Sequence, residues 1–275
     1  MTVITFTPAS YIRPIFILLP LSVYINWDFQ ISGVWGKMAE NNNSVILFER
    51  FLQRWMVSQE HYLDELLTTE RNCGEYGEKE MTDLVSRVLT HYQLYYEQKS
   101  RVIERNVFVV FSPPWFTPLE RTLLWIGGFK PGLAFRIVAE AVGELSEDQR
   151  RRMNELQEET RTEERLLSDE LARIQETVAA PPLMELTRQA GRRRDGEILG
   201  SDSVTELLSS ALETVVRDAE LLRMSTAVKV VEILTPIQNV KFLGAVGRFH
   251  MKIRTWGLQR NREGGANDWK NGVFG

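Results

Sequence analysis

Few residues in this chain have side chains suited to nucleophilic or metal chemistry. Among its 275 residues there are three histidines, His61, His91 and His250, and one cysteine, Cys73. The motifs H-E-x-x-H, G-x-S-x-G, G-x-x-x-x-G-K-[ST] and G-x-G-x-x-G do not occur. A di-iron bundle needs Glu-x-x-His on two helices, and no histidine here follows a glutamate by three residues. We therefore expect a protein that is not an enzyme and holds no metal.

The single cysteine and the net charge limit the compartment and the partners. Cys73 alone excludes an intramolecular disulfide and a zinc site built from cysteine pairs, which fits a reducing compartment, nucleus and/or cytoplasm. The net charge is -4, and basic residues are mostly interleaved with acidic ones. Such a chain has no overall positive field to attract a polyanion. We expect that it does not bind DNA on its own.

The segment 113–131, PPWFTPLERTLLWIGGFKP, contains signals for a helix start and a helix stop. Thr117 is suited to the N-cap, Pro118 to the first helical position, and Glu120 to the closing position of a capping box. Gly127 and Gly128 are suited to the left-handed backbone conformation that ends a helix. The segment therefore predicts a short helix with a buried aromatic face.

The rest of the chain from Ser44 onward shows mainly helical periodicity. Three further capping boxes are predicted, formed by Ser146 with Gln149, Ser203 with Glu206, and Thr235 with Gln238. Only 107–111 resembles a strand, and it is short enough to be a helix end. We predict an all-α fold, a single helical bundle of long amphipathic helices with a charged mobile linker at 187–203. The predicted core includes Trp115, Leu124, Trp125, Leu222, Leu234 and Trp256.

The first residues differ from the remainder. An apolar run at 11–25 is interrupted by Pro14 and Pro20, is too short to span a bilayer and has no A-x-A type cleavage site, so we expect no membrane span. We interpret the stretch before Met38 as an extended gene model, with a targeting or membrane-contact segment, or a disordered tail, as alternatives. The expected division is an N-terminal extension at 1–43, one domain at 44–262 and a disordered tail at 263–275.

The segment 113–131 resembles the signature of the plant DOG1 domain, W-x-T/S-P-L/A-E-x-x-x-x-W-I/M-G-G. This seed-dormancy module also forms the C-terminal part of TGA-type bZIP transcription factors. The matching residues are Trp115, Thr117, Pro118, Leu119, Glu120, Trp125, Ile126, Gly127 and Gly128. Three further blocks, at 48–67, 145–160 and 221–257, follow in the family's order. Trp115 and Trp125 are most simply core aromatics, so we take this signature as a mark of fold.

The resemblance implies a non-enzymatic plant regulatory protein that acts through protein contacts in seed dormancy, germination or the regulation of transcription. Residues 1–48 contain neither a basic region nor leucine heptads, so any role at DNA is expected to be indirect. The expected partners are clade A protein phosphatases 2C or transcription regulators. The oligomeric state is left open.

The opening helix carries the residues that the resemblance associates with partner binding. In the dormancy branch this helix is associated with phosphatase docking, and its opening resembles Y-L-E-W. The segment FLQRW keeps both aromatics, Phe51 and Trp55, but places Gln53 and Arg54 near the acidic position. We therefore predict Phe48, Phe51 and Trp55 either as a docking face or as core residues.

His250 is a candidate haem ligand by resemblance alone. The last helix of the dormancy branch resembles L-H-x-x-x-H-E-W-G, in which two histidines one turn apart suit axial contacts to haem iron. Here the segment reads FHMKIRTWG, so His250 matches the first histidine and Arg254 occupies the second position. The leading expectation is thus no cofactor, and the alternative is a sensor that holds haem or an apolar small ligand inside the bundle.

Overall fold

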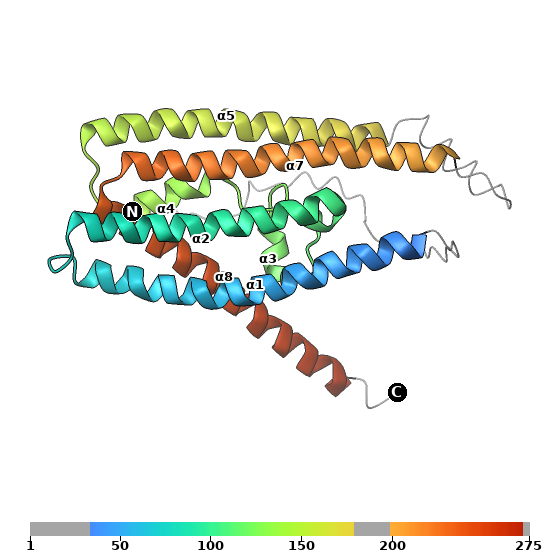
Figure 1. Cartoon of the computed structure of the whole chain (residues 1–275), viewed down its shortest axis with the longest axis horizontal. Coiled ribbons are helices and arrows are strands. Elements are labelled where there is room, and N and C mark those ends of the chain that lie inside the picture. Colours follow the sequence, from blue (N-terminus) through green and yellow to red (C-terminus); the bar gives the residue numbers. More distant parts are fainter. Residues whose placement is uncertain (1–33, 179–198, 272–275) are drawn as a thin grey trace, which may run out of the picture. The chain divides into compact units, whose positions relative to one another are not determined.

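The structure is a computed structural model that describes residues 34–178 and 199–271. The chain forms two compact units, Met1–Met38 and Ala39–Gly275, and of the first only the start of helix α1 is described. The elements in chain order are α1 (Val34–Arg71), α2 (Glu78–Arg105), the 3-10 helix η1 (Val107–Phe111), α3 (Pro118–Thr122), α4 (Leu133–Ala141), α5 (Glu147–Val178), α7 (Leu199–Ile233) and α8 (Pro236–Asn271). No described residue belongs to a β-strand, and the all-α prediction is confirmed (Figure 1).

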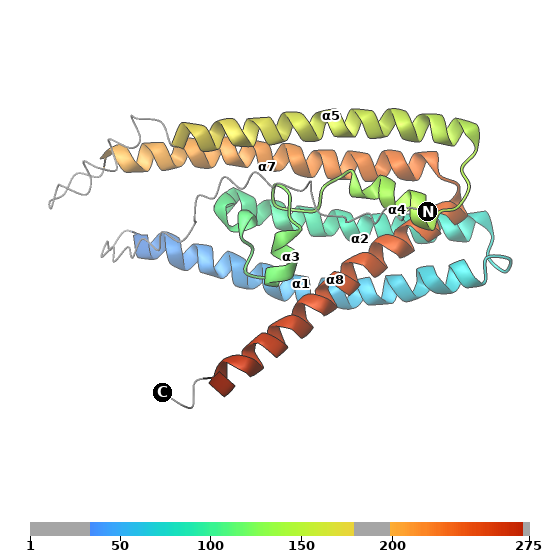
Figure 2. The ribbon, with the colours of Figure 1, turned by 180° about the vertical axis from the view of Figure 1, so that it is seen from behind.

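Within the second unit the long helices pack in pairs. Helices α5 and α7 lie side by side along most of their length, and α7 also contacts α2 and η1 (Figures 1 and 2). Helix α8 follows α7 directly and contacts α2, α3 and α4. The short helices α3 and α4 are thereby placed between the long ones.

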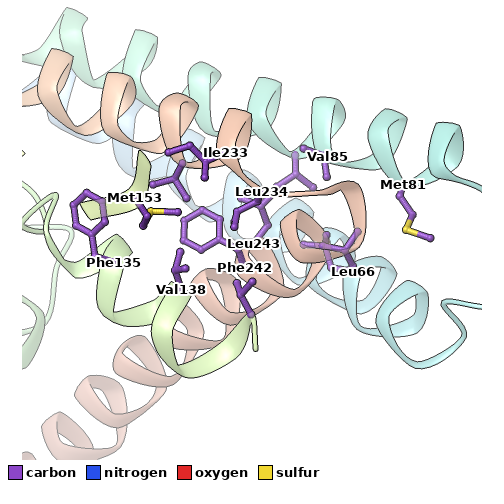
Figure 3. Close-up of a cluster of buried hydrophobic side chains, with 14 of the residues drawn as sticks. Leu66, Met81, Val85, Phe135, Val138, Met153, Ile233, Leu234, Phe242 and Leu243 are labelled. Carbon is purple, nitrogen blue, oxygen red and sulfur yellow. The ribbon is translucent and has the colours of Figure 1, made fainter. Parts of the chain in front are cut away.

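The largest apolar cluster lies where α1, α2, α4, α5, α7 and α8 meet. Figure 3 shows side chains from these helices converging in one core, among them Leu66, Val85, Val138, Leu234 and Phe242. Burying one such side chain contributes about 1.5–3 kcal/mol. A second cluster joins η1, α2, α5 and α7, and a third joins α1 and α2 to Trp115.

Three of the predicted capping boxes lie in described parts of the chain with both bonds present, and they are confirmed. At Thr117 the backbone N–H donates to Glu120 Oε2 (2.7 Å), and the Glu120 N–H donates to Thr117 Oγ1 (3.3 Å). The same reciprocal bonds form between Ser146 and Gln149 and between Thr235 and Gln238. Helix α7, however, begins at Leu199, before the predicted start at Ser203.

Several other predicted boundaries differ from the structure. Helix α3 ends at Thr122, so Trp125 lies in a turn and not on a helix. The segment Val107–Phe111 is a 3-10 helix. Helix α8 continues to Asn271, through most of the segment predicted as a disordered tail. Residues 187–198 of the predicted linker and the extension before Val34 lie outside the described residues.

The predicted core is confirmed in part. Trp115 and Leu234 are buried, whereas Leu124, Trp125 and Leu222 are half-buried. Trp256 was predicted wrongly, because its side chain is 51% exposed on α8.

Candidate functional site

The Trp-Ile-Gly-Gly part of the signature forms a tight turn. The Trp125 N–H donates to the Gly128 carbonyl (2.6 Å), and the Gly128 N–H donates back to the Trp125 carbonyl (3.2 Å). Ile126 has φ 45° and Gly127 has φ 76°. A left-handed conformation is uncommon for a branched residue and persists only where surrounding contacts enforce it. Ile126 is 5% exposed, so packing holds it in place.

Arg223 of α7 binds the carbonyl groups of this turn. Its Nε donates to the Phe129 carbonyl (2.7 Å), and its Nη2 donates to the carbonyls of Ile126 (2.9 Å) and Trp125. A Cβ on Gly128 would lie 2.8 Å from Arg223 Nε. The second glycine of the signature therefore gives the guanidinium room to reach the backbone.

Lys99 of α2 and Glu220 of α7 complete a buried charged cluster with Arg223. The Lys99 Nζ donates to Glu220 Oε1 (2.5 Å) and to the Gly127 carbonyl (2.6 Å), and Arg223 Nη1 donates to the same Glu220 oxygen (3.1 Å). Burial lowers the pKa of Lys99, and Glu220 opposes that effect. Glu220 Oε2 is buried and has no hydrogen-bond partner among the described residues. We refer to Lys99, Glu220 and Arg223 as the charged clamp.

A cavity of about 220 Å³ adjoins the charged clamp. Its walls are mainly apolar and come from α1, α2, α4, α7 and α8; they include Leu52, Met56, Leu89, Tyr92, Tyr95, Tyr96, Phe129, Ala134, Ile137, Ala227, Val246 and Ile253. Tyrosine hydroxyl groups are protonated at neutral pH, and burial raises the pKa of Tyr95 and Tyr96 further. The cavity is thus an apolar volume with charged and hydroxyl groups in its wall.

The capping box of α3 is tied to α8 through Arg254. Its Nη1 donates to Glu120 Oε2 (2.9 Å) and to the Trp115 carbonyl (2.8 Å). Nearby, a Cβ on Gly257 would lie 2.1 Å from Thr117 Oγ1, so α8 and the N-cap of α3 are in very close contact. Arg254, which stands where the dormancy branch has its second histidine, is therefore part of the structural support of the signature.

Two of the three predicted docking residues face the interior. Phe48 and Trp55 are 3% and 7% exposed, and Phe51 is half-buried. The Phe48 ring lies 4.6 Å from the Trp115 ring, and the Trp55 indole donates to the His91 carbonyl (2.9 Å). These contacts fit the core interpretation of the residues, and docking through them stays a prediction.

His250 lies in the cavity wall, packed between aromatic side chains. Its ring stacks on Phe129 at 5.2 Å, and its Nδ1 is 3.4 Å from the Tyr92 hydroxyl. Burial lowers its pKa to about 4, so the imidazole is neutral at pH 7 and suited to ligation or hydrogen bonding. Arg254 cannot act as a second axial ligand, because a guanidinium has no acceptor.

The sequence interpretation missed the charged clamp. Lys99 follows Tyr95 by four residues and precedes Val102 by three, which places a cation on the apolar stripe of α2. Glu220 and Arg223 interrupt the apolar stripe of α7 between Val216 and Val230 in the same way. A charge on an inward stripe is the signal that could have identified them, since buried charges are paired.

No group of three or more metal-ligating side chains gathers among the residues whose side chains the structure describes, 43–177 and 205–262. None of the helices within residues 34–178 and 199–271 has the length and apolar content needed to cross a membrane.

Comparison with known proteins identifies the family. The family model for seed dormancy control, DOG1, matches residues 62–140. Protein RESPONSE TO ABA AND SALT 1 of Arabidopsis thaliana is 33% identical over 78% of this chain and 96% of its own length, and Protein DOG1-like 4 of the same plant is 31% identical over 78% and 93%. Transcription factor TGA2.3 of Oryza sativa subsp. japonica is 25% identical over 82% of this chain and 68% of its own length. With the signature turn and its supporting clamp in place, the chain belongs to the DOG1 family of plant regulatory proteins, to which the TGA transcription factors are related.

Proposed function

We propose that this protein is a non-enzymatic regulator that acts through protein contacts in seed dormancy, germination or the control of transcription. The family model for seed dormancy control and the relatives that are named as transcription factors support this role. The TGA relatives favour action in the nucleus, with the cytoplasm as a further location. The proposed partner is a clade A protein phosphatase 2C or a transcription regulator.

The observation that carries the adaptor role is the outward face of α1. Ile46, Leu47 and Val57 are 46%, 52% and 68% exposed, and Arg50 and Arg54 lie between them along the helix. Large apolar side chains next to arginine are typical of binding surfaces. Docking on the outward side of α1 leaves Phe48 and Trp55 in the core, so partner binding requires no unfolding.

Binding to a purified clade A protein phosphatase 2C tests this proposal. Leu47→Asp combined with Val57→Asp should weaken binding at least about tenfold, equal to about 1.4 kcal/mol, in calorimetric titration. The matched control combines Leu166→Asp with Leu207→Asp, since these leucines are 53% and 73% exposed on α5 and α7. If both double variants lose the same affinity for the phosphatase while their circular dichroism is unchanged, α1 is not the docking element.

A second candidate function, favoured by the cavity, is the sensing of a small apolar ligand. The volume of about 220 Å³ is below the roughly 300–1,000 Å³ of pockets for drug-sized ligands. Haem is larger than such ligands and finds one imidazole here, so a compact molecule fits better than haem.

Two titrations test the ligand hypothesis. When haem is added, the absorption in the Soret region should be the same for the wild type and for a variant that lacks the His250 imidazole. A compact apolar fluorescent probe such as naphthalene should bind the wild type, and Ala227→Leu, which fills part of the cavity, should reduce that binding. An unchanged probe signal in the variant would argue against the cavity as a ligand site.

A further inference from the structure

One oxygen of the Glu220 carboxylate has no donor. Glu220 belongs to the wall of the cavity of about 220 Å³, and its Oε1 accepts hydrogen bonds from Lys99 (2.5 Å) and Arg223 (3.1 Å). Its Oε2 is buried and has no hydrogen-bond partner among the described residues. A buried carboxylate oxygen without a donor is costly, and buried polar atoms of native proteins are nearly always hydrogen-bonded. This oxygen is therefore suited to accept a hydrogen bond from a molecule in the cavity.

Two tyrosine hydroxyl groups lie near this carboxylate. Tyr95 and Tyr96 line the cavity, and their hydroxyls make no hydrogen bond to a described residue. Burial raises the pKa of both hydroxyls and the negative charge of Glu220 raises it further, so both lie close to that charge. Tyr92, in contrast, already accepts a hydrogen bond from Gln59 Nε2 (3.1 Å). We call Tyr95, Tyr96 and Glu220 the polar wall of the cavity.

The remainder of the cavity suits a compact apolar body. Its walls are formed mainly by aliphatic and aromatic side chains, among them Leu52, Met56, Leu89, Ala227 and Val246. The volume of about 220 Å³ is below the roughly 300–1,000 Å³ of pockets for drug-sized ligands. A ligand of this cavity is therefore small, and most of its surface is apolar.

Among the described residues, every lysine and arginine of the cavity wall has a partner. The two cations of the charged clamp are bound to its carboxylate and to backbone carbonyls. Lys130 lies 3.4 Å from Glu164, and Arg254 is bound to Glu120 at 2.9 Å. A carboxylate ligand would be desolvated beside the charge of Glu220 with no free cation to pair with it. The polar wall therefore disfavours an acid.

We propose that the cavity binds a compact neutral hydroxyl compound, a phenol or an alcohol with an apolar body. Its hydroxyl donates to Glu220 Oε2 and accepts from the hydroxyl of Tyr95 or Tyr96, while its body fills the apolar part of the cavity. A hydroxyl group fits the polar wall because it offers both a donor and an acceptor. This inference rests on the ligand-sensing function proposed above and names the class of its ligand.

Fluorescence titration of the full chain with naphthalene and three derivatives tests the ligand class. Naphthol should bind at least about tenfold more tightly than naphthalene, because its hydroxyl donates to a charged acceptor in a site shielded from water. Methoxynaphthalene, substituted at the same ring position, has no proton to donate and should lose this advantage. Naphthoate brings a second negative charge next to Glu220 and should bind more weakly than naphthol.

Variants of the polar wall test the residues. Tyr95→Phe combined with Tyr96→Phe should reduce the preference for naphthol over naphthalene at least about fivefold and leave the affinity for naphthalene unchanged, because only two hydroxyl groups are removed. The matched control is Tyr62→Phe, since Tyr62 is partly buried in the bundle but does not line the cavity. The control should keep the full preference for naphthol.

The outcomes separate this inference from the function on which it rests. If naphthalene binds and naphthol binds no more tightly, the hydroxyl class is wrong while the cavity stays a ligand site. Tighter binding of naphthoate than of naphthol would also overturn the inference. If none of the four compounds binds, both the inference and the ligand-sensing function fail. If the double tyrosine variant does not fold by circular dichroism, the four titrations of the wild type still decide between these outcomes.

Discussion

Replacing Lys99 by methionine removes the cation of the charged clamp while keeping a side chain of similar length. Lys99 is 2% exposed and donates hydrogen bonds to Glu220 and to the Gly127 carbonyl. In the variant Glu220 Oε1 keeps its bond from Arg223, but the Gly127 carbonyl loses this donor. We therefore expect Lys99→Met to destabilise both the α2–α7 contact and the signature turn.

The expected magnitude follows from these contacts. Removing one partner of a buried ion pair costs about 3–5 kcal/mol, and a buried carbonyl left without a donor costs about 1–3 kcal/mol. The remaining Arg223 bond and the easier burial of a thioether reduce the total, so we expect a loss of roughly 3 kcal/mol. At roughly 2–4 °C per kcal/mol for a chain of this size, the melting temperature should fall by about 6–12 °C.

Urea and thermal unfolding, followed by circular dichroism, measure the loss. The control Lys229→Met removes an exposed lysine that is bound to Glu159 at 2.8 Å, and it should cost less than about 1 kcal/mol. Adding Glu220→Gln to Lys99→Met should lower the stability further, since Arg223 then remains buried without a carboxylate partner. Equal losses for Lys99→Met and Lys229→Met would refute a structural role for the charged clamp.

Three further predictions concern α8 and the core. Gly257→Ala should lower the free energy of unfolding in urea by about 1–3 kcal/mol, because the new Cβ would lie 2.1 Å from Thr117 Oγ1. This loss should exceed the gain of about 1 kcal/mol in helix propensity. The control Gly74→Ala should not destabilise the protein, since no atom lies within 4 Å of its new Cβ. Burial lowers the pKa of His250 to about 4, so the unfolded state takes up this proton first and the stability should fall between pH 6.5 and 4, by up to about 3 kcal/mol from this residue. In pH-dependent melting His250→Phe should reduce this dependence and leave the part due to His91, whose pKa is also lowered to about 4 by burial. Trp55→Ala should lower the free energy of unfolding by about 3–5 kcal/mol, since the indole is buried. A urea titration that gives the same free energy of unfolding as the wild type would disprove its role in the core.

The short-range signals in the sequence determined much of the fold. The capping boxes at Thr117, Ser146 and Thr235 were predictable because each depends on two residues three positions apart in one helical turn. The amphipathic stripes of α1, α2 and α5 indicated long helices for the same reason. The resemblance in 113–131 identified the family on residue types alone.

Contacts between distant segments decided the rest. Trp125 and Trp256 are both tryptophans near glycines, yet one packs against Arg223 and the other is exposed, and no neighbouring residue distinguishes them. Arg254 reaches Glu120 across 134 positions of the chain. Local chemistry determines whether a segment is helical, but the burial of a side chain depends on which other helix packs over it, and that is fixed only by the assembled bundle.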